Sequence, residues 1–167
     1  TYGHGLWQRV FAELRPLYPD IEASHLYIDN LAFQMVKNPA QFQVIVTCNM
    51  FGDIISDLGA SLVGGLGLSP SGNVNPEGVS MFEPVHGSAP KYAGQNRANP
   101  LGAVLTTAML LEHLGLAAEA GWVEQAVRAA VRENQTTVDL GGSLGTRQAG
   151  DWLANYITAK FSAPAAR

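Results

Sequence analysis

The chain has 167 residues and a mass of 17.8 kDa, with 47% hydrophobic residues, 14% charged residues and a formal net charge of −4. This composition excludes a disordered chain, and the acidic balance argues against a nucleic-acid or anionic-membrane binder. A single cysteine, Cys48, excludes an intrachain disulfide and an all-cysteine metal cage. Because neither a spanning apolar run nor a secretory signal is visible, we expect a cytoplasmic globular protein. The missing initiator methionine suggests that the chain starts partway through a longer one.

The first part of the chain is predicted to alternate helices with strands. Leu6, Val10 and Leu14 recur at helical spacing, and the run 42–47 is nearly all apolar, as in a strand covered on both faces. This alternation predicts an α/β fold, in which helices lie on both sides of a sheet. The expected order is helix 6–17, strand 25–28, helix 31–36, strand 42–47 and helix 49–64.

The second part is predicted to be mostly helical. Glycine, serine and proline accumulate over 64–72, which is where we place any domain boundary. Residues 79–83 form the one extended candidate in an ordered loop. Three helices are then expected, over 101–114, 117–134 and 146–161.

Three aspartates are candidate metal ligands. Asp53 and Asp57 are four residues apart, which places their carboxylates about 40° apart on one helix face. They follow a strand of the buried type, and hard oxygen donors there suit Mg²⁺ or Mn²⁺. The alternative is that the pair complements a helix dipole and faces solvent. Asp29 also follows a predicted strand, and its alternative role is that of a turn residue or of the N-cap of a helix starting at Asn30.

A loop of small residues, 83–90, is a candidate nucleotide-binding segment. Gly87 and Ser88 would let backbone amides approach a nucleotide closely. The segment matches neither a P-loop nor the G-x-G-x-x-G fingerprint of dinucleotide-binding folds. An ordinary structural turn is therefore the alternative interpretation.

Three separated motifs together carry a family resemblance. They read VIVTCNMFGDIISD over 44–57, FEPVHGSAP over 82–90 and ANP over 98–100. In this order they closely resemble the β-hydroxyacid oxidative decarboxylases, which include the 3-isopropylmalate, isocitrate, homoisocitrate and tartrate or D-malate dehydrogenases. The resemblance implies an isopropylmalate dehydrogenase-like sheet sandwiched by helices.

The resemblance also implies site roles. Asp53 and Asp57 match ligands of a divalent cation, Mg²⁺ or Mn²⁺, and Asp29 matches the catalytic metal ligand supplied by the other subunit of a homodimer. In the family, a 2-hydroxy diacid passes hydride from C2 to NAD or NADP and then loses CO₂, with the cation as Lewis acid. The positions that match the lining of the cofactor site are Glu83, near the nicotinamide, and His86, Gly87, Ser88, Ala89 and Asn99.

One departure bears on the choice of cofactor. Where NAD-using relatives commonly have Asp-Ile, this chain has Lys91 and Tyr92, which resemble the NADP-using isocitrate dehydrogenases. A lysine attracts a 2′-phosphate and a tyrosine can donate to it, so we predict NADP over NAD. The second basic cluster of those enzymes is not evident around 139–146. The alternative is that Lys91 is a solvated loop residue.

The matched region corresponds to the C-terminal half of a family member. Residues 1–64 would belong to the central substrate and dimerisation domain, and residues 65–167 to the cofactor-binding domain. The family's substrate-clamping arginines, catalytic tyrosine and catalytic lysine lie upstream of this region, so we expect the chain alone to be inactive. The leading function is a 3-isopropylmalate dehydrogenase-like activity. The alternatives are another substrate of the family, or an inactive module for dimerisation or nucleotide binding.

Overall fold

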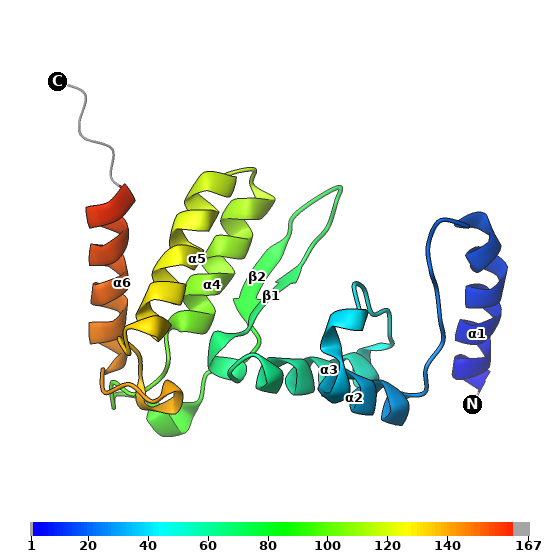
Figure 1. Ribbon diagram of the computed structural model, residues 1–167, viewed down its shortest axis with the longest axis horizontal. Helices are drawn as coiled ribbons and strands as arrows, with labels where there is room; N and C mark the ends of the chain where they lie inside the picture. The colour runs from blue at the N-terminus through cyan, green and yellow to red at the C-terminus, as the bar shows by residue number, and fades with distance from the viewer. Residues whose placement is uncertain (1, 162–167) are drawn as a thin grey trace. The chain divides into compact units, whose positions relative to one another are not determined.

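The computed structural model describes residues 2–161 (Figure 1). Its contacts divide the chain into two compact units, the first ending at Ile45 and the second beginning at Val46. The helices and strands are α1 (Tyr2–Leu14), α2 (Ile28–Lys37), α3 (Asn49–Leu62), β1 (Pro70–Asn73), β2 (Met81–Pro84), α4 (Leu101–His113), α5 (Ala117–Arg132) and α6 (Thr146–Phe161).

The N-terminal unit contains α1 and α2. Helix α1 has the predicted apolar stripe, but it buries none of its residues, and Leu6 is 49% exposed. Helix α2 buries Leu31 and Met35, which are four residues apart on one face. Apolar surface in this unit is therefore largely in contact with solvent.

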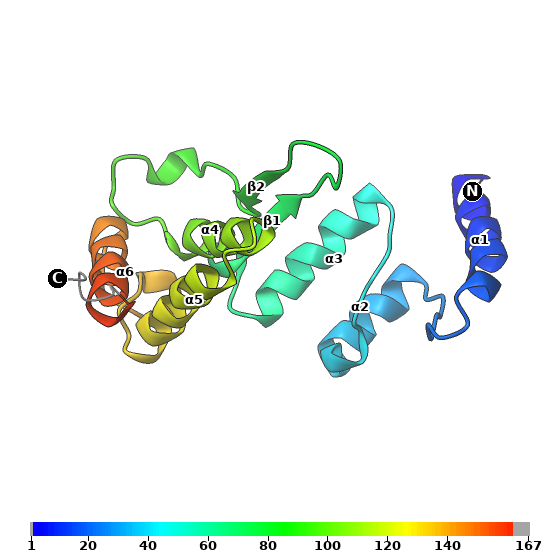
Figure 2. The ribbon, with the colours of Figure 1, turned by 90° about the horizontal axis from the view of Figure 1, so that it is seen from above.

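The hydrophobic core lies in the C-terminal unit, among α4, α5 and α6, which run side by side (Figures 1 and 2). Leu101 at the start of α4 is fully buried against residues of α5 and α6, including Leu153. Buried alanines dominate α5, and their small side chains let neighbouring helices approach closely. Those alanines are Ala120, Ala126, Ala129 and Ala130.

A two-stranded antiparallel hairpin packs on α4. Gly72 of β1 is paired with Phe82 of β2. A Cβ atom on Gly72 would lie 3.0 Å from the Phe82 ring and 3.3 Å from Sδ of Met109, so glycine lets the hairpin sit close to the helix. Strand β2 overlaps the predicted extended segment 79–83. Strand β1 was not predicted, because its proline, serine and glycine are residues typical of turns.

Two predicted strands are wrong. Residues 25–27 have no regular secondary structure, and Ile28 already begins α2; residues 42–47 likewise form no strand. Val44 is 82% exposed and Val46 is 75% exposed, the opposite of a strand covered on both faces. The physical reason is that a strand needs a neighbouring backbone to accept its hydrogen bonds, and within residues 2–161 only β1 and β2 pair.

The predicted helices are confirmed. Helix α6 has the predicted bounds, α3 ends two residues early at Leu62, and α2 is longer than predicted at both ends. The fold is thus a helix-rich α/β arrangement with a small sheet. The predicted boundary between domains at 64/65 falls inside the second compact unit and stays a prediction. Within the described residues, no helix has both the length and the apolar character needed to cross a membrane.

Candidate functional site

Helix α3 presents two carboxylates to solvent. It begins at Asn49, and the Gly52 N–H closes its first turn by donating to the Cys48 carbonyl oxygen at 2.8 Å. Asp53 and Asp57 are exposed, and Ile55 is buried. The alternative is correct in that both aspartates face solvent, but they lie beyond the first turn, where the dipole effect is concentrated. Four-residue spacing leaves the two carboxylates on one face, open to a cation.

The Asp53 carboxylate has a neighbour on its own helix. Asn49 Nδ2 donates to Asp53 Oδ2 over a long 3.4 Å, and Ser56 Oγ donates to the Asp53 carbonyl oxygen at 3.0 Å. Neither contact neutralises the charge. Hard oxygen donors of this kind fit Mg²⁺ or Mn²⁺. No three His, Cys, Asp or Glu side chains gather into a metal site within residues 2–161, so the described chain offers this pair and not a complete ligand set.

Asp29 lies in the N-terminal unit, as the second residue of α2, and is exposed. The helix starts at Ile28 with Tyr27 as its N-cap, and no side chain caps it. The alternative role as a cap for a helix starting at Asn30 is therefore wrong. Asp29 lies in the first turn of α2, where its carboxylate complements the helix dipole. The exposed carboxylate could still bind a ligand.

The candidate cofactor loop begins on the hairpin. Glu83 pairs with Ser71 across the hairpin, and its side chain is exposed while Phe82 and Pro84 are half-buried. Beyond β2 the Val85 N–H donates to the Ser69 carbonyl oxygen at 3.1 Å. This hydrogen bond ties the start of the loop to the residue that precedes β1, and the hairpin packs on α4.

His86 fixes the loop next to the start of α4. Its Nδ1 donates to the Gly87 carbonyl oxygen at 3.0 Å, which leaves Nε2 as an acceptor in the neutral ring. Nε2 is buried and has no hydrogen-bond partner among the described residues. A Cβ atom on Gly102 would lie 3.3 Å from Nε2, so this glycine makes room for the ring. The His86 ring therefore holds the loop through the Gly87 carbonyl oxygen and lies against Gly102 of α4.

Three successive backbone amides of this loop are free. The N–H groups of Gly87, Ser88 and Ala89 donate no hydrogen bond within the part of the chain that the structure describes. Ala89 has a left-handed backbone, with φ 43° and ψ 62°. A Cβ atom on Gly87 would meet nothing within 4 Å, so the surface above it is open. Unpaired consecutive amides are the donor set that binds phosphate oxygens, and this set fits a dinucleotide cofactor.

Asn99 has a defined structural role. Its Oδ1 accepts the Leu101 N–H at 2.9 Å where α4 begins, and its Nδ2 donates to Asp139 Oδ2 at 2.9 Å. Thr137 Oγ1 donates to the other oxygen of Asp139. A Cβ atom on Gly67 would lie 2.9 Å from Asn99 Nδ2, so this glycine leaves room for the network, whose Asp139 end is exposed. Cofactor contact by Asn99 stays a prediction.

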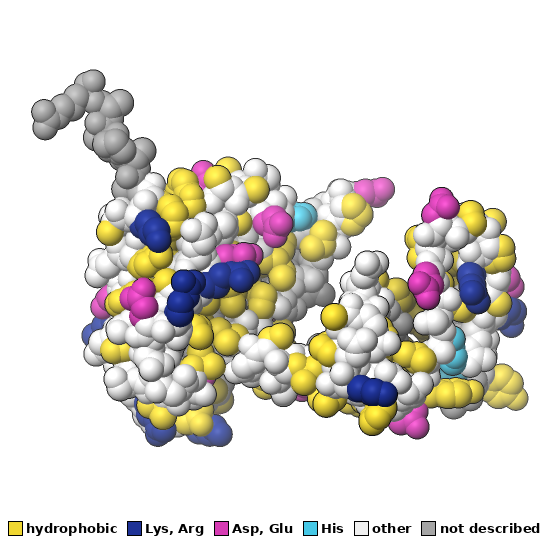
Figure 3. Space-filling view, in the orientation of Figure 1, with side chains coloured by type: hydrophobic (Ala, Val, Ile, Leu, Met, Phe, Trp, Pro, Cys, Tyr) yellow, Lys and Arg dark blue, Asp and Glu magenta, His cyan; other side chains and the backbone are white. Residues whose placement is uncertain are grey.

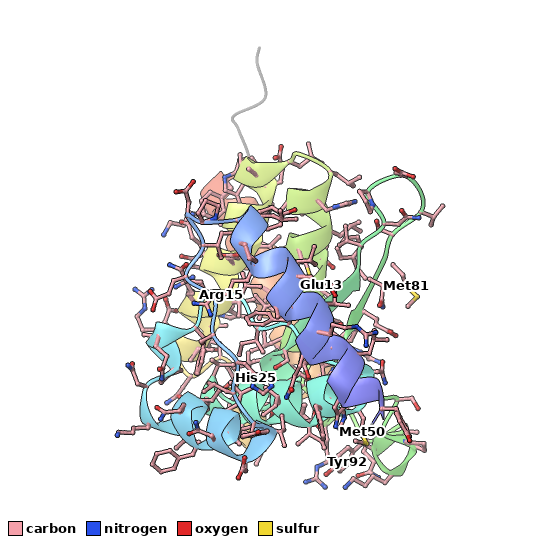
Figure 4. The ribbon with its side chains drawn as sticks, turned by 90° about the vertical axis from the view of Figure 1, so that its right-hand side faces the viewer. Glu13, Arg15, His25, Met50, Met81 and Tyr92 are labelled. Carbon is pink, nitrogen blue, oxygen red and sulfur yellow. The ribbon has the colours of Figure 1, made fainter. Side chains whose placement is uncertain are left out.

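Lys91 and Tyr92 lie together beyond the free amides, on a 3₁₀ turn at Pro90–Tyr92. Lys91 Nζ lies 4.9 Å from the centroid of the Tyr92 ring, and Arg97 Cζ lies 5.6 Å from it. Tyr92 is labelled in Figure 4, and Figure 3 shows lysine and arginine side chains at several places on the C-terminal unit, its lower end among them. The predicted pair is therefore part of a larger basic cluster.

Sequence reasoning missed Arg97 and Arg147. Both line an open pocket of about 380 Å³, together with Tyr92, Gly94, Asn96, Ala98 and Thr146. The two arginines are fifty positions apart in the sequence, and no motif joins them. Arg147 lies one residue beyond the segment 139–146, where a second basic cluster was not evident.

Comparison with known proteins identifies the family. The family model described as isocitrate/isopropylmalate dehydrogenase matches residues 2–153. The chain therefore belongs to the isocitrate/isopropylmalate dehydrogenase family, a family of dehydrogenases.

Individual relatives agree with this assignment. The chain is 47% identical to 3-isopropylmalate dehydrogenase of Thermobifida fusca, over 94% of its own length and 44% of the relative's. It is 44% identical to homoisocitrate dehydrogenase of Methanocaldococcus jannaschii, over 94% of its own length and 45% of the relative's. The crystal structure of isocitrate dehydrogenase from Methylococcus capsulatus superimposes with a TM-score of 0.86 at 40% identity, covering 92% of this chain and 46% of that one. The chain spans less than half the length of these relatives.

Proposed function

We propose that this chain forms part of the active site of a metal- and NAD(P)-dependent oxidative decarboxylase that acts on a 2-hydroxy diacid of the 3-isopropylmalate type. The observation that carries the proposal is that one compact unit contains both two open carboxylates on α3 and a run of free loop amides. Isocitrate, homoisocitrate and tartrate or D-malate are the alternative substrates, because relatives of nearly equal identity bear different substrate names.

Asp53 and Asp57 would hold the divalent cation. In this proposal, Asp29 of a second copy of the chain supplies a further carboxylate, so the working protein is a homodimer. Asp29 is suited to this by its exposure at the start of α2, where no other described side chain engages it. When bound, the cation would polarise the oxygen on C2 of the substrate, and the nicotinamide would accept hydride from that carbon.

The loop 83–92 would hold the cofactor. The amides of Gly87, Ser88 and Ala89 would donate to its phosphate oxygens, and Glu83 would face the nicotinamide end. His86 would position the loop from below through its bond to the Gly87 carbonyl oxygen. Lys91 and Tyr92 would bind the 2′-phosphate of NADP, which is the cofactor we favour.

The roles assigned to this chain are binding and orientation. In the family that this chain resembles, the catalytic tyrosine and lysine lie upstream of the matched region, so we expect no turnover by the chain alone. The second candidate function is a non-catalytic module for dimerisation or nucleotide binding, and the free loop amides of 87–89 would serve nucleotide binding in that case as well.

The test is titration of the full chain with Mn²⁺, followed by electron paramagnetic resonance of the free ion. We expect saturable binding that weakens at least about 10-fold in Asp53→Asn and in Asp57→Asn, since each removes a charged oxygen ligand. The control is Asp151→Asn, which changes an exposed aspartate of α6 and should leave the affinity unchanged. Equal affinity in all four proteins, or no saturation at all, would contradict the proposed metal site.

A further inference from the structure

Arg97 and Arg147 bring two positive charges to one pocket in an otherwise acidic chain. Both side chains are exposed, and neither forms an ion pair within the described residues. The salt bridge found there joins Arg128 to Glu124. Two uncompensated guanidinium groups in a shared pocket repel one another. An anion placed between them would remove that repulsion and accept charge-assisted hydrogen bonds.

The pocket is built rather than accidental, because hydrogen bonds tie the Arg97 loop to the start of α6. The Thr146 N–H donates to the Asn96 carbonyl oxygen at 3.1 Å, and the Arg147 N–H donates to Asn96 Oδ1 at 2.9 Å. Asn96 Nδ2 donates to Gln148 Oε1 at 2.9 Å, and Thr146 Oγ1 donates to the Ala98 carbonyl oxygen. These contacts hold segments fifty residues apart in one arrangement.

The backbone at this junction has little freedom. Asn96 adopts a left-handed conformation with φ 53°, and Asn tolerates that region better than most residues. A Cβ atom on Gly145 would clash with the ends of the Asn96 and Gln148 side chains, so a larger residue there would displace the hydrogen bond between them. The arginines are therefore presented by a fixed scaffold, which lowers the entropy cost of binding a ligand.

An anion in this pocket would be bound by side chains and not by backbone amides. The amides of Thr146 and Arg147 are already used by Asn96, so they cannot donate to a ligand. Arg97 Cζ lies 5.6 Å from the centroid of the Tyr92 ring, and a cation–π contact of this kind uses none of the N–H donors of the guanidinium. Tyr92 also lines the pocket, so the Lys91–Tyr92 pair is continuous with the two arginines.

We propose that Arg97 and Arg147 form a subsite for a phosphate monoester, the 2′-phosphate on the adenosine ribose of NADP, and so set the preference for NADP over NAD. This inference rests on the proposed function and adds two residues to the part assigned to Lys91 and Tyr92. Tyr92, which lines the pocket with the two arginines, follows the free amides of 87–89 in the chain, so a cofactor whose phosphates bind those amides would direct its adenosine end toward the arginines. They take the place of the basic cluster that the segment 139–146 lacks.

The experiment is isothermal titration calorimetry of the full chain and of Arg97→Gln, Arg147→Gln and the double variant, with NADP⁺, NAD⁺, 2′-AMP, 5′-AMP and inorganic phosphate. We expect each single substitution to weaken NADP⁺ and 2′-AMP roughly 10- to 100-fold, because each removes hydrogen bonds to a charged group. Binding of NAD⁺ and 5′-AMP should change less than 2-fold. Arg132→Gln, an exposed arginine of α5 outside the pocket, is the matched control.

The possible results separate this subsite from the proposed function. Equal losses for NADP⁺ and NAD⁺, or no loss for either, would overturn the 2′-phosphate subsite while cofactor binding stands. Inorganic phosphate that binds as tightly as 2′-AMP would show a non-selective anion pocket and would also overturn the subsite. If neither cofactor binds the unchanged chain, the cofactor role and the subsite both fail.

Discussion

The two compact units differ in how they use similar sequence patterns. Helix α1 and helix α4 are both rich in apolar residues, yet α1 buries none and α4 buries Leu101 completely. The difference is the presence of partners, because α5 packs on α4 and α6 packs on α5 within the same unit. An apolar stripe predicts a surface that needs covering, and only a neighbouring element turns it into core.

The largest expected effect comes from truncating a core side chain. Leu101→Ala leaves a cavity among α4, α5 and α6 and should lower the free energy of unfolding by about 2–5 kcal/mol. Leu6→Ala makes the same chemical change on half-exposed α1 and should stay within about 0.5 kcal/mol. Urea unfolding followed by circular dichroism measures both. Similar losses in the two variants would mean that the units do not differ in packing.

A pair of glycine substitutions sharpens the comparison inside the C-terminal unit. A Cβ atom on Gly142 would lie 2.0 Å from the Thr136 carbonyl oxygen, so Gly142→Ala should lower the free energy of unfolding by about 1–3 kcal/mol. On Gly121, within α5, a Cβ atom meets nothing within 4 Å, so Gly121→Ala should raise it by about 0.5–1 kcal/mol. Thermal melting distinguishes the two signs. A gain in both variants would contradict the close approach at Gly142.

Local sequence patterns predict the helices well and the strands poorly. The spacing of apolar residues, Pro100 before α4 and Gly115 after it define helix ends, because a helix satisfies its hydrogen bonds within its own segment. A strand depends on another segment, so the β-branched run at 42–47 does not by itself form one. Strand β1 is the opposite example, because residues typical of turns form a strand there by pairing with β2.

In the candidate site too, residues related by local sequence are predictable, and residues brought together by tertiary contacts are not. Asp53 and Asp57 are predictable because their relation is set by helix geometry, and the loop 83–92 is predictable because its motif is contiguous. The cluster of Arg97 with Arg147 depends on how Asn96 docks on α6, and no local pattern encodes that contact. The free amides of 87–89 likewise follow from loop conformation rather than residue type alone.

We propose that the residues that hold the phosphate and adenosine part of the cofactor all lie in the C-terminal unit. The most direct measurement is titration of the ¹⁵N-labelled full chain with NADP⁺, followed by the amide chemical shifts. We expect saturable shifts confined to residues 83–99 and 146–148, with the largest at Gly87, Ser88 and Ala89, whose amides are free. Shifts centred on residues 2–27, or no saturable shift at all, would contradict the account.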